Sequence, residues 1–379
     1  MIVRHFLQWV RTAGAADRAD ATSALARAYL YSDLTPDDRI AAEGAMIMLL
    51  DDPSPLVRRA LAEALGSSSE APAPVIMALA SDQPEVAAIV LERSPLLLDA
   101  DLVDMVGGGN AQVQTAIARR CDLPRSVAAA IAEVGVPEAC LTLVENALAD
   151  IVSFSLARIV ERFGDLGAIR EAMFARADLP AAIRQALVVK LSDTLAGFVV
   201  QREWLEEARA QRIAKEACEK ATIALAGTSD LTQVRPLVRH LRESGQLNSG
   251  LVLRALLSGH ILLFEEALAE LAGLPLDRVA ALLADRRGAG LRALYDKAGL
   301  PASMFLAVRA ALDAMHETGF LADLGGTTRL KRRMVERVLT ACEDVPTSEI
   351  EPLLTLLRRF ATEAAREEAR LFCEELAAA

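Results

Sequence analysis

The stretch RCDLP at residues 120–124 returns as RADLP at residues 176–180, and LADIV at residues 148–152 lies midway between them. The Asp residues within these phrases are 28 positions apart in both intervals. A fixed period of this length is typical of proteins built from stacked structural repeats. The phrases therefore predict a chain assembled from units of about 28 residues.

A second series of phrases supports the same period. It begins as PLV at residue 55 and recurs as PEV, AQV and PEA at residues 84, 111 and 137, which are 29, 27 and 26 positions apart. The third residue of each phrase is followed three and four positions later by residues that are nearly all apolar, and this is the spacing of one helical face. The two series together indicate one apolar helical stripe per unit.

The residues between the apolar stripes are typical of the starts and ends of short helices. A unit of about 28 residues has room for two helices of roughly 10 to 12 residues and two tight turns. Thr35-Pro36 and Ser54-Pro55 each place a hydroxyl before a proline at the first helical position. One helix pair cannot bury both of its faces, so neighbouring pairs must stack. We therefore predict an all-α fold that begins as a right-handed α-solenoid.

The composition agrees with a helical protein. The 379 residues include 71 Ala, and only 4% of residues are aromatic whereas 53% are hydrophobic. Sheets favour β-branched and aromatic residues, and disordered chains are far less apolar. A net charge of −11 also opposes tight binding to nucleic acid or to an anionic membrane surface.

The pattern changes along the chain and suggests four segments. Residues 1–190 hold the 28-residue units, and residues 191–229 contain a charge-rich stretch that is interpreted as one long connecting helix. Residues 230–325 form a second helical block, where Gly245, Gly273 and Gly299 recur at a spacing of 28 and 26. Such glycines are typical of helix ends. Residues 326–379 are predicted to form C-terminal helices, which either cap the structure or pair with a second copy.

The sequence predicts no catalytic residue, no cofactor and no metal ligand. No familiar nucleotide-binding, zinc or nucleophile motif occurs in the chain. Two imidazole and carboxylate pairs, His240 with Glu243 and Asp313 with His316, lie three residues apart on one helical face, as in a helical metal site. Chance pairs of this kind are common among 52 acidic residues, so both are interpreted as structural. The glycine run at residues 107–109 is likewise interpreted as a turn rather than a phosphate-binding loop.

One dense basic run is the candidate binding surface. On a helix, Arg329, Arg333 and Arg337, with Arg332 nearby, share a face that would suit an anion or an acidic partner. The alternative is a solvated helix face whose arginines pair with acids of the same chain, such as Glu336.

A second set of arginines occupies one phase of the predicted units. Arg93, Arg120 and Arg176 each follow a helix and precede a turn. They are predicted to bind the free carbonyls at the end of their own helix, together with a nearby Asp. One unit carries Leu148 at this position, whereas a column of arginines that binds a ligand should be continuous. We therefore expect that removal of one arginine lowers the melting temperature modestly and leaves partner binding unchanged.

The five cysteines are interpreted as buried thiols of a cytoplasmic protein. Their number is odd, their spacing is wide and no CxxC occurs. Charged and polar residues interrupt the first ten residues, so no secretory signal is predicted there.

The turn phrases resemble those of known proteins. The Asp-Leu-Pro and Pro-x-Val phrases resemble degenerate HEAT-type repeats. In combination with GLPLDRV at residues 273–279 and GLPASMF at residues 299–305, they are similar to an uncharacterised proteobacterial family of helical-repeat proteins. This resemblance implies a fold but no activity, and HEAT-like proteins usually hold another protein in their concave face.

The predicted function is therefore a non-catalytic scaffold or adaptor that binds a protein partner. Two alternatives stay open. An enzyme whose site converges from scattered residues leaves no motif in the sequence. A HEAT-like nucleic-acid-binding protein would need a continuous basic groove, which the acidic composition does not favour.

Overall fold

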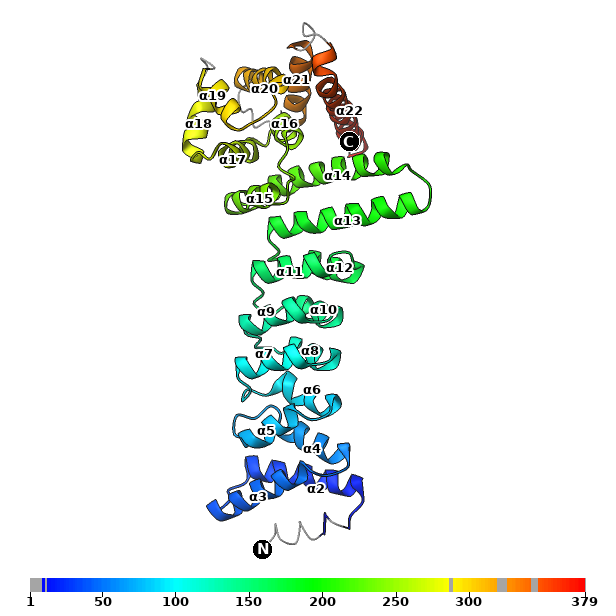
Figure 1. The fold of residues 1–379 in the computed structure, drawn as a ribbon, viewed down its shortest axis with the longest axis vertical. Helices are drawn as coiled ribbons and strands as arrows, with labels where there is room; N and C mark the ends of the chain where they lie inside the picture. The colour runs from blue at the N-terminus through cyan, green and yellow to red at the C-terminus, as the bar shows by residue number, and fades with distance from the viewer. Residues whose placement is uncertain (1–8, 11, 286–288, 319–325, 342–346, 379) are drawn as a thin grey trace. The chain divides into compact units, whose positions relative to one another are not determined.

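The computed structural model describes residues 9–10, 12–285, 289–318, 326–341 and 347–378 (Figure 1). These residues form helices joined by short turns, and no strand occurs among them. The prediction of an all-α protein is therefore confirmed for the described part of the chain. Chain contacts divide the protein into two compact units, residues 1–179 and residues 180–379.

Unit 1, which we define as residues 1–179, is made of short helices. They are α2 (Ala15–Tyr31), α3 (Pro36–Leu49), α4 (Pro55–Leu65), α5 (Ala73–Ala80), α6 (Pro84–Arg93), α7 (Asp99–Gly108), α8 (Ala111–Ala118), α9 (Arg125–Val134), α10 (Pro137–Glu145), α11 (Ser153–Phe163) and α12 (Gly167–Ala175).

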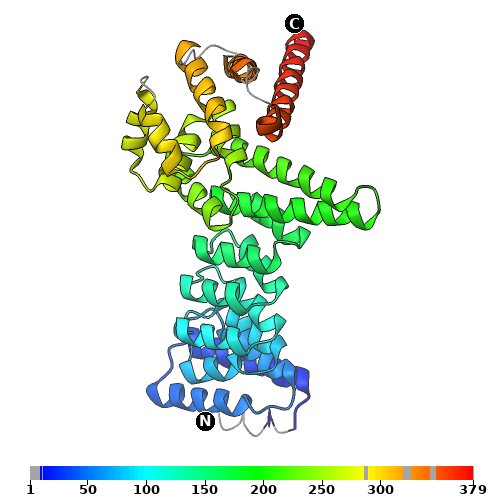
Figure 2. The same ribbon diagram turned by 45° about the horizontal axis from the view of Figure 1, so that its top comes forward.

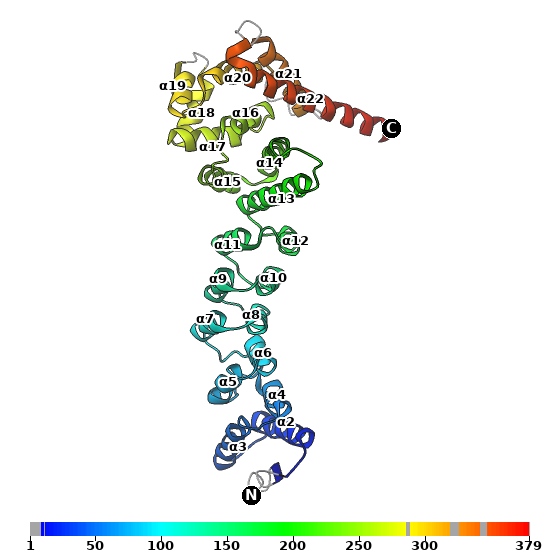
Figure 3. The same cartoon turned by 45° about the vertical axis from the view of Figure 1, so that its right-hand side comes forward.

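The helices of unit 1 pack against their next-but-one neighbours. Helices α6, α8, α10 and α12 form one row of successive contacts, and α7, α9 and α11 form a second row (Figure 3). Helices α7, α9 and α11 begin at residues 99, 125 and 153, so each pair starts 26 or 28 residues after the one before it. The predicted apolar stripes lie inside the stack, where Leu61, Val90, Ile117 and Leu143 are completely buried. Burial of these side chains supplies the main driving force for stacking.

In the row formed by α6, α8, α10 and α12, a polar side chain after each of the last three helices binds the end of the preceding helix of the row. Arg120 follows α8 and donates hydrogen bonds of 2.6 and 2.7 Å to the carbonyls of Leu91 and Ser94 at the end of α6. Asn146 follows α10 and donates from Nδ2 at 3.0 and 2.8 Å to the carbonyls of Ala118 and Arg120.

Arg176 continues this series after α12. Its Nη1 lies 3.1 and 3.3 Å from the carbonyl oxygens of Val144 and Asn146, and its guanidinium also pairs with Asp178. We call the three residues Arg120, Asn146 and Arg176 the clasp residues, because each satisfies carbonyls at the end of the preceding even-numbered helix.

The clasp residues correct the prediction for the arginine series. Arg120 and Arg176 bind carbonyls of the preceding helix pair rather than those of their own helix, although the predicted contact between Arg176 and Asp178 is present. Asn146 makes the equivalent contact in the unit where Leu148 replaces the arginine. Arg93 is exposed and lies 3.6 Å from Glu92. The difference arises because free helix-end carbonyls point along the helix axis, and a side chain reaches those of the stacked neighbour more easily than its own.

The predicted helix starts are present, with one difference in their chemistry. Prolines occupy the first turn of α3 and α4, and Thr35 accepts a hydrogen bond of 3.2 Å from the amide of Asp38. Ser54 is the residue before α4 but makes no side-chain cap; its own amide instead donates to Asp52 at 2.8 Å. The Asp52 carboxylate, paired with Arg18, replaces the serine as the polar anchor of this turn.

Unit 2, which we define as residues 180–379, begins with two long helices. Its elements are α13 (Ala181–Gln201), α14 (Glu207–Thr228), α15 (Leu231–Glu243), α16 (Ser249–Leu257), α17 (Ile261–Ala272), α18 (Leu276–Ala284), α19 (Ala289–Lys297), the short 3₁₀ helix η1 (Ala302–Met304), α20 (Phe305–Thr318), α21 (Gly326–Ala341) and α22 (Thr347–Ala378).

Helices α13 and α14 differ from the predicted connector. They lie side by side in opposite directions (Figures 1 and 2), whereas the sequence suggested one connecting helix within residues 191–229 and a boundary at residue 190. The chain reverses at residues 202–206, where Glu203 adopts a left-handed backbone with φ of 57°. The amide of Trp204 then closes the turn on the carbonyl of Val199 at 3.0 Å. A non-glycine residue in this conformation gives no sequence signal, which is why the reversal was not predicted.

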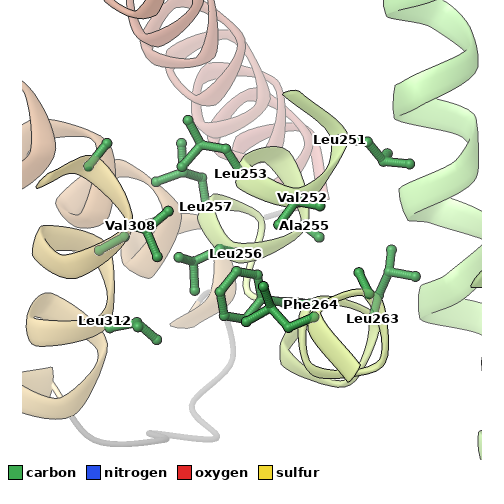
Figure 4. Close-up of a cluster of buried hydrophobic side chains, with 14 of the residues drawn as sticks. Leu251, Val252, Leu253, Ala255, Leu256, Leu257, Leu263, Phe264, Val308 and Leu312 are labelled. Atoms are coloured by element: carbon green, nitrogen blue, oxygen red, sulfur yellow. The ribbon is translucent and has the colours of Figure 1, made fainter. Parts of the chain in front are cut away.

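The core of unit 2 surrounds α16. All residues of the run 251–257 are buried, and they pack against α17 through Phe264 and toward α20 through Val308 and Leu312 (Figure 4). A helix buried on every side is a central helix rather than an amphipathic surface helix. The run also contains one cation, Arg254, which is buried.

Glycines end several helices of unit 2, as the sequence predicted. Gly245, Gly273 and Gly299 all have positive φ values, of 70°, 63° and 68°. Only glycine adopts this backbone region without a steric cost. The recurrence of these three residues in the sequence therefore marks helix ends.

Candidate functional site

The predicted basic face lies on α21, where two of its four arginines pair with acidic residues of the same chain. Arg332 pairs with Glu336 at 2.8 Å, and Nη2 of Arg337 lies 3.1 Å from Glu317 on α20. Arg333 is exposed, and the side chain of Arg329 lies outside the described residues. The pairing with Glu336 corresponds to the alternative of a solvated face that binds acids of the same chain. Surface pairs of this kind contribute little stability, about 0 to 1 kcal/mol each.

A cleft between α20 and α21 brings two predicted groups together. Its volume is about 410 Å³, and Asp313, His316 and Arg337 all line it, with Arg309 and Glu317 beside them. Arg309 lies 3.9 Å from Asp313, and Arg337 lies 3.1 Å from Glu317. Each carboxylate of the cleft thus has an arginine beside it. The arrangement is therefore a charge-balanced polar cleft.

His240, the other predicted imidazole, belongs to a partly buried chain of side-chain amides. Its Nε2 lies 3.1 Å from Oε1 of Gln185, and Nε2 of Gln185 donates to Gln246 at 2.5 Å. The ring therefore meets an amide rather than the carboxylate of Glu243, which is exposed. Across the described residues, no group of three or more His, Cys, Asp or Glu side chains is placed to hold a metal ion.

Burial gives unit 2 a predicted response to acid. Desolvation lowers the pKa of His240 below its ordinary value of 6.5, with a smaller opposing effect of Glu243. Desolvation and Lys331 lower the pKa of His260. Unfolded imidazoles then bind protons at a higher pH than the folded ones, so the free energy of unfolding should decrease as the pH falls from about 7 to about 5. Urea unfolding at several pH values measures this slope. The variant His240→Gln should flatten it, and an unchanged slope would contradict the role of His240.

The glycine run at residues 107–109 is a helix end. Gly107 and Gly108 finish α7, and the side chain of Asn110 accepts a hydrogen bond of 3.1 Å from the amide of Val113 at the start of α8. A Cβ atom on Gly109 would lie only 2.4 Å from the carbonyl oxygen of Met105 on α7 and 2.7 Å from Cγ1 of Val113 on α8. Close packing of the two helices therefore explains the glycine at this position, in agreement with the turn interpretation.

The four cysteines within the described residues are free thiols, but not all of them are buried. Cys140 is buried, and desolvation raises the pKa of its thiol to about 11. Cys121 and Cys373 are exposed, contrary to the prediction, because the first lies in the turn after α8 and the second on an exposed part of α22. Cys342 lies outside the described residues.

Charge is distributed unevenly between the two units. Residues 1–179 contain 25 Asp or Glu, 15 Arg and no Lys, so unit 1 carries ten of the eleven net negative charges. Several of its arginines are already bound within the fold, including Arg120, Arg162 and Arg176 on backbone carbonyls. Acidic side chains therefore dominate the charge that unit 1 offers to a partner.

A groove between α10 and α12 lies on unit 1 and has a volume of about 800 Å³. Alanines line much of it, and Glu145, Glu171 and Asp178 border it. Asp178 belongs to a predicted turn phrase, whereas the sequence predicted no role for Glu145 or Glu171. The one available signal was the spacing of Ala168, Ala172 and Ala175, which places them on one face of α12.

No helix within the described residues has the length and apolar character that a membrane span requires.

Comparisons with known proteins agree with a bacterial origin. The family model described as an uncharacterised protein conserved in bacteria (DUF2336) matches residues 86–347. No curated protein and no solved structure matches the chain. The matched region begins within α6, extends to the first residue of α22 and covers more than half of the chain. The protein therefore belongs to the DUF2336 family of bacterial proteins.

Proposed function

We propose that this protein is a non-catalytic scaffold whose unit 1 is a HEAT-like, right-handed α-solenoid that binds a protein partner. The observation that carries this proposal is the acidic, grooved surface of a stack of helix pairs. Short stacked helices bury their apolar stripes against each other and leave an extended row of turns and helix faces for a ligand. The clasp residues support a stack of fixed geometry, which reduces the entropy lost when a partner binds.

The charges of the two units favour a protein over a nucleic acid. The excess of ten negative charges in unit 1 repels a phosphate backbone at long range. An enzyme with a dispersed site is the second candidate. The α20/α21 cleft is its best location, and the arginines there are bound to carboxylates.

The burial of one face of α22 favours the capping role for this C-terminal helix over pairing with a second copy. Leu353, Leu357 and Phe360 on α22 are buried in the core of unit 2, which is expected of a helix that covers the end of a packed domain. Free thiols on the surface are compatible with a reducing compartment, so we place the protein in the cytoplasm.

The experiment is affinity capture by the full-length protein from bacterial extract, with and without nuclease, followed by reconstitution with the purified partner. We expect a protein to be captured in both conditions and to form a complex of defined stoichiometry when the two purified chains are mixed. Capture that is lost after nuclease treatment would contradict the proposal in favour of nucleic-acid binding. Substrate turnover that is abolished by His316→Ala or Asp313→Ala would contradict it in favour of an enzyme.

A further inference from the structure

The groove between α10 and α12 has a floor that suits close packing. Ala168, Ala172 and Ala175 follow the spacing i, i+4 and i+7 along α12, and the opposite side is lined by Val144 of α10 and Ala147 in the turn after α10. Alanine side chains allow another backbone to approach closely, and helices that pack through small residues lie about 8 Å apart. The groove is therefore suited to an elongated, rod-like ligand.

The border of the groove is acidic and is not neutralised by the fold. Arg176 is engaged by Asp178 at 2.8 Å and by the carbonyl of Val144. Glu145 and Glu171 are exposed, and neither forms an ion pair with another described residue. Two carboxylates therefore remain available to a ligand on the same groove.

The end of α12 adds to this negative potential. Ala175, the last residue of α12, lines the groove, whereas the carbonyls of Val144 and Asn146 at the end of α10 are already bound by Arg176. A helix C-terminus carries about half a negative charge and favours cations. Lysine or arginine side chains of a ligand would be stabilised here, whereas a purely apolar ligand would remove the carboxylates from water without compensation.

From the apolar floor, the two unmatched carboxylates and the net negative charge of unit 1, we infer that this groove is the docking site for a basic amphipathic helix of a partner protein. The small side chains of the ligand helix face the alanine floor, and its Lys or Arg residues face Glu145 and Glu171. The inference rests on the proposed scaffold function and names the chemistry of the partner segment.

The test uses the full-length protein and a synthetic helical peptide of about four turns, with Ala and Leu on one face and Lys on the other. A second peptide carries Glu in place of Lys. Isothermal titration measures both affinities. The salt concentration is about 0.15 M, because charges more than about 8 Å apart are then largely screened and the general acidic field contributes little. We expect the Lys peptide to bind and the Glu peptide to show no binding.

Variants of the groove separate a specific site from a general acidic field. The double variant Glu145→Lys/Glu171→Lys should weaken binding of the Lys peptide at least about tenfold. Ala172→Trp keeps the charge and fills the floor, and should weaken binding to a similar degree. The matched control Glu85→Lys/Asp104→Lys makes the same change of charge at exposed acids on α6 and α7. It should change the affinity less than about twofold.

The outcomes distinguish the groove from the scaffold proposal. Equal loss of affinity in the groove and control variants, or no binding of the Lys peptide to the wild-type protein, would overturn the groove inference. If the groove double variant still captured the partner found in the affinity experiment, the groove would be wrong and the scaffold function would stand. If the wild-type protein captured no protein, the scaffold function itself would be wrong.

Discussion

Replacement of Arg120 with alanine should lower the free energy of unfolding by about 2 to 4 kcal/mol, because it leaves two buried carbonyls without a donor. The side chain is 8% exposed, and its hydrogen bonds at 2.6 and 2.7 Å are the direct link between the ends of α6 and α8. Burial lowers the pKa of its guanidinium, while Asp122 and Asp99 favour the charged form. This effect is larger than the modest one that the sequence suggested, because a carbonyl of a helix end that lies between stacked pairs has no water to replace the lost donor.

Calorimetry and hydrogen exchange measure the effect. We expect the transition of unit 1 to shift down by at least about 5 °C, with the largest loss of exchange protection in α6 and α8. The matched control is Arg119→Ala, which removes an exposed guanidinium at the adjacent position and should cost less than about 0.5 kcal/mol. Equal effects of the two substitutions would show that the clasp contributes nothing specific to stacking.

Replacement of Arg254 with methionine should cost about 3 to 5 kcal/mol, because it leaves the largely buried carboxylate of Glu219 without its cation. Arg254 is 4% exposed in the middle of α16. Its Nη1 lies 2.9 Å from Glu363 on α22, its Nε lies 3.4 Å from Glu219 on α14, and its guanidinium covers the ring of Phe360 at 4.3 Å. One cation thus joins three helices of unit 2, and its loss should release α22 first.

Limited proteolysis and hydrogen exchange of α22 measure whether this helix is released in the variant. The control variant Lys220→Ala removes the exposed second partner of Glu363, at 2.8 Å, and should cost less than about 1 kcal/mol. Addition of Glu219→Gln to Arg254→Met should recover part of the lost stability, since an uncharged amide is less costly to bury than a carboxylate. Unchanged protection of α22 in Arg254→Met would contradict the assigned role of this arginine.

The exposed aromatic side chains of the α13/α14 turn are a second surface of interest in unit 2. Trp204 is 65% exposed and contacts the ring of Phe198 edge to face, with the ring centroids 5.7 Å apart. The guanidinium of Arg202 lies 5.2 Å from the centroid of Phe198. These contacts stabilise the turn itself, and they explain how a non-glycine reversal persists at Glu203.

The candidate groove could be predicted only in part. The alanine stripe of α12 is visible in the sequence as a helical spacing, because one helix fixes which of its own residues share a face. Glu145 and Asp178 are 33 residues apart, and only the contact of α10 with α12 brings them to one border. The same reason applies to the α20/α21 cleft, where the predicted Asp313 and His316 share a helix but Arg337 comes from the next one.

The sequence by itself determined the helical class and the positions of many helix starts and ends. Period, proline, threonine and glycine act through local backbone geometry, and local geometry is specified by neighbouring residues. Only the tertiary structure decided which carbonyls Arg120 and Arg176 bind, where the chain reverses between α13 and α14, and how Arg254 joins three helices. These features depend on contacts between residues about 30 to 110 positions apart, or on a backbone conformation that no residue type signals, and stacking of the helices selects both.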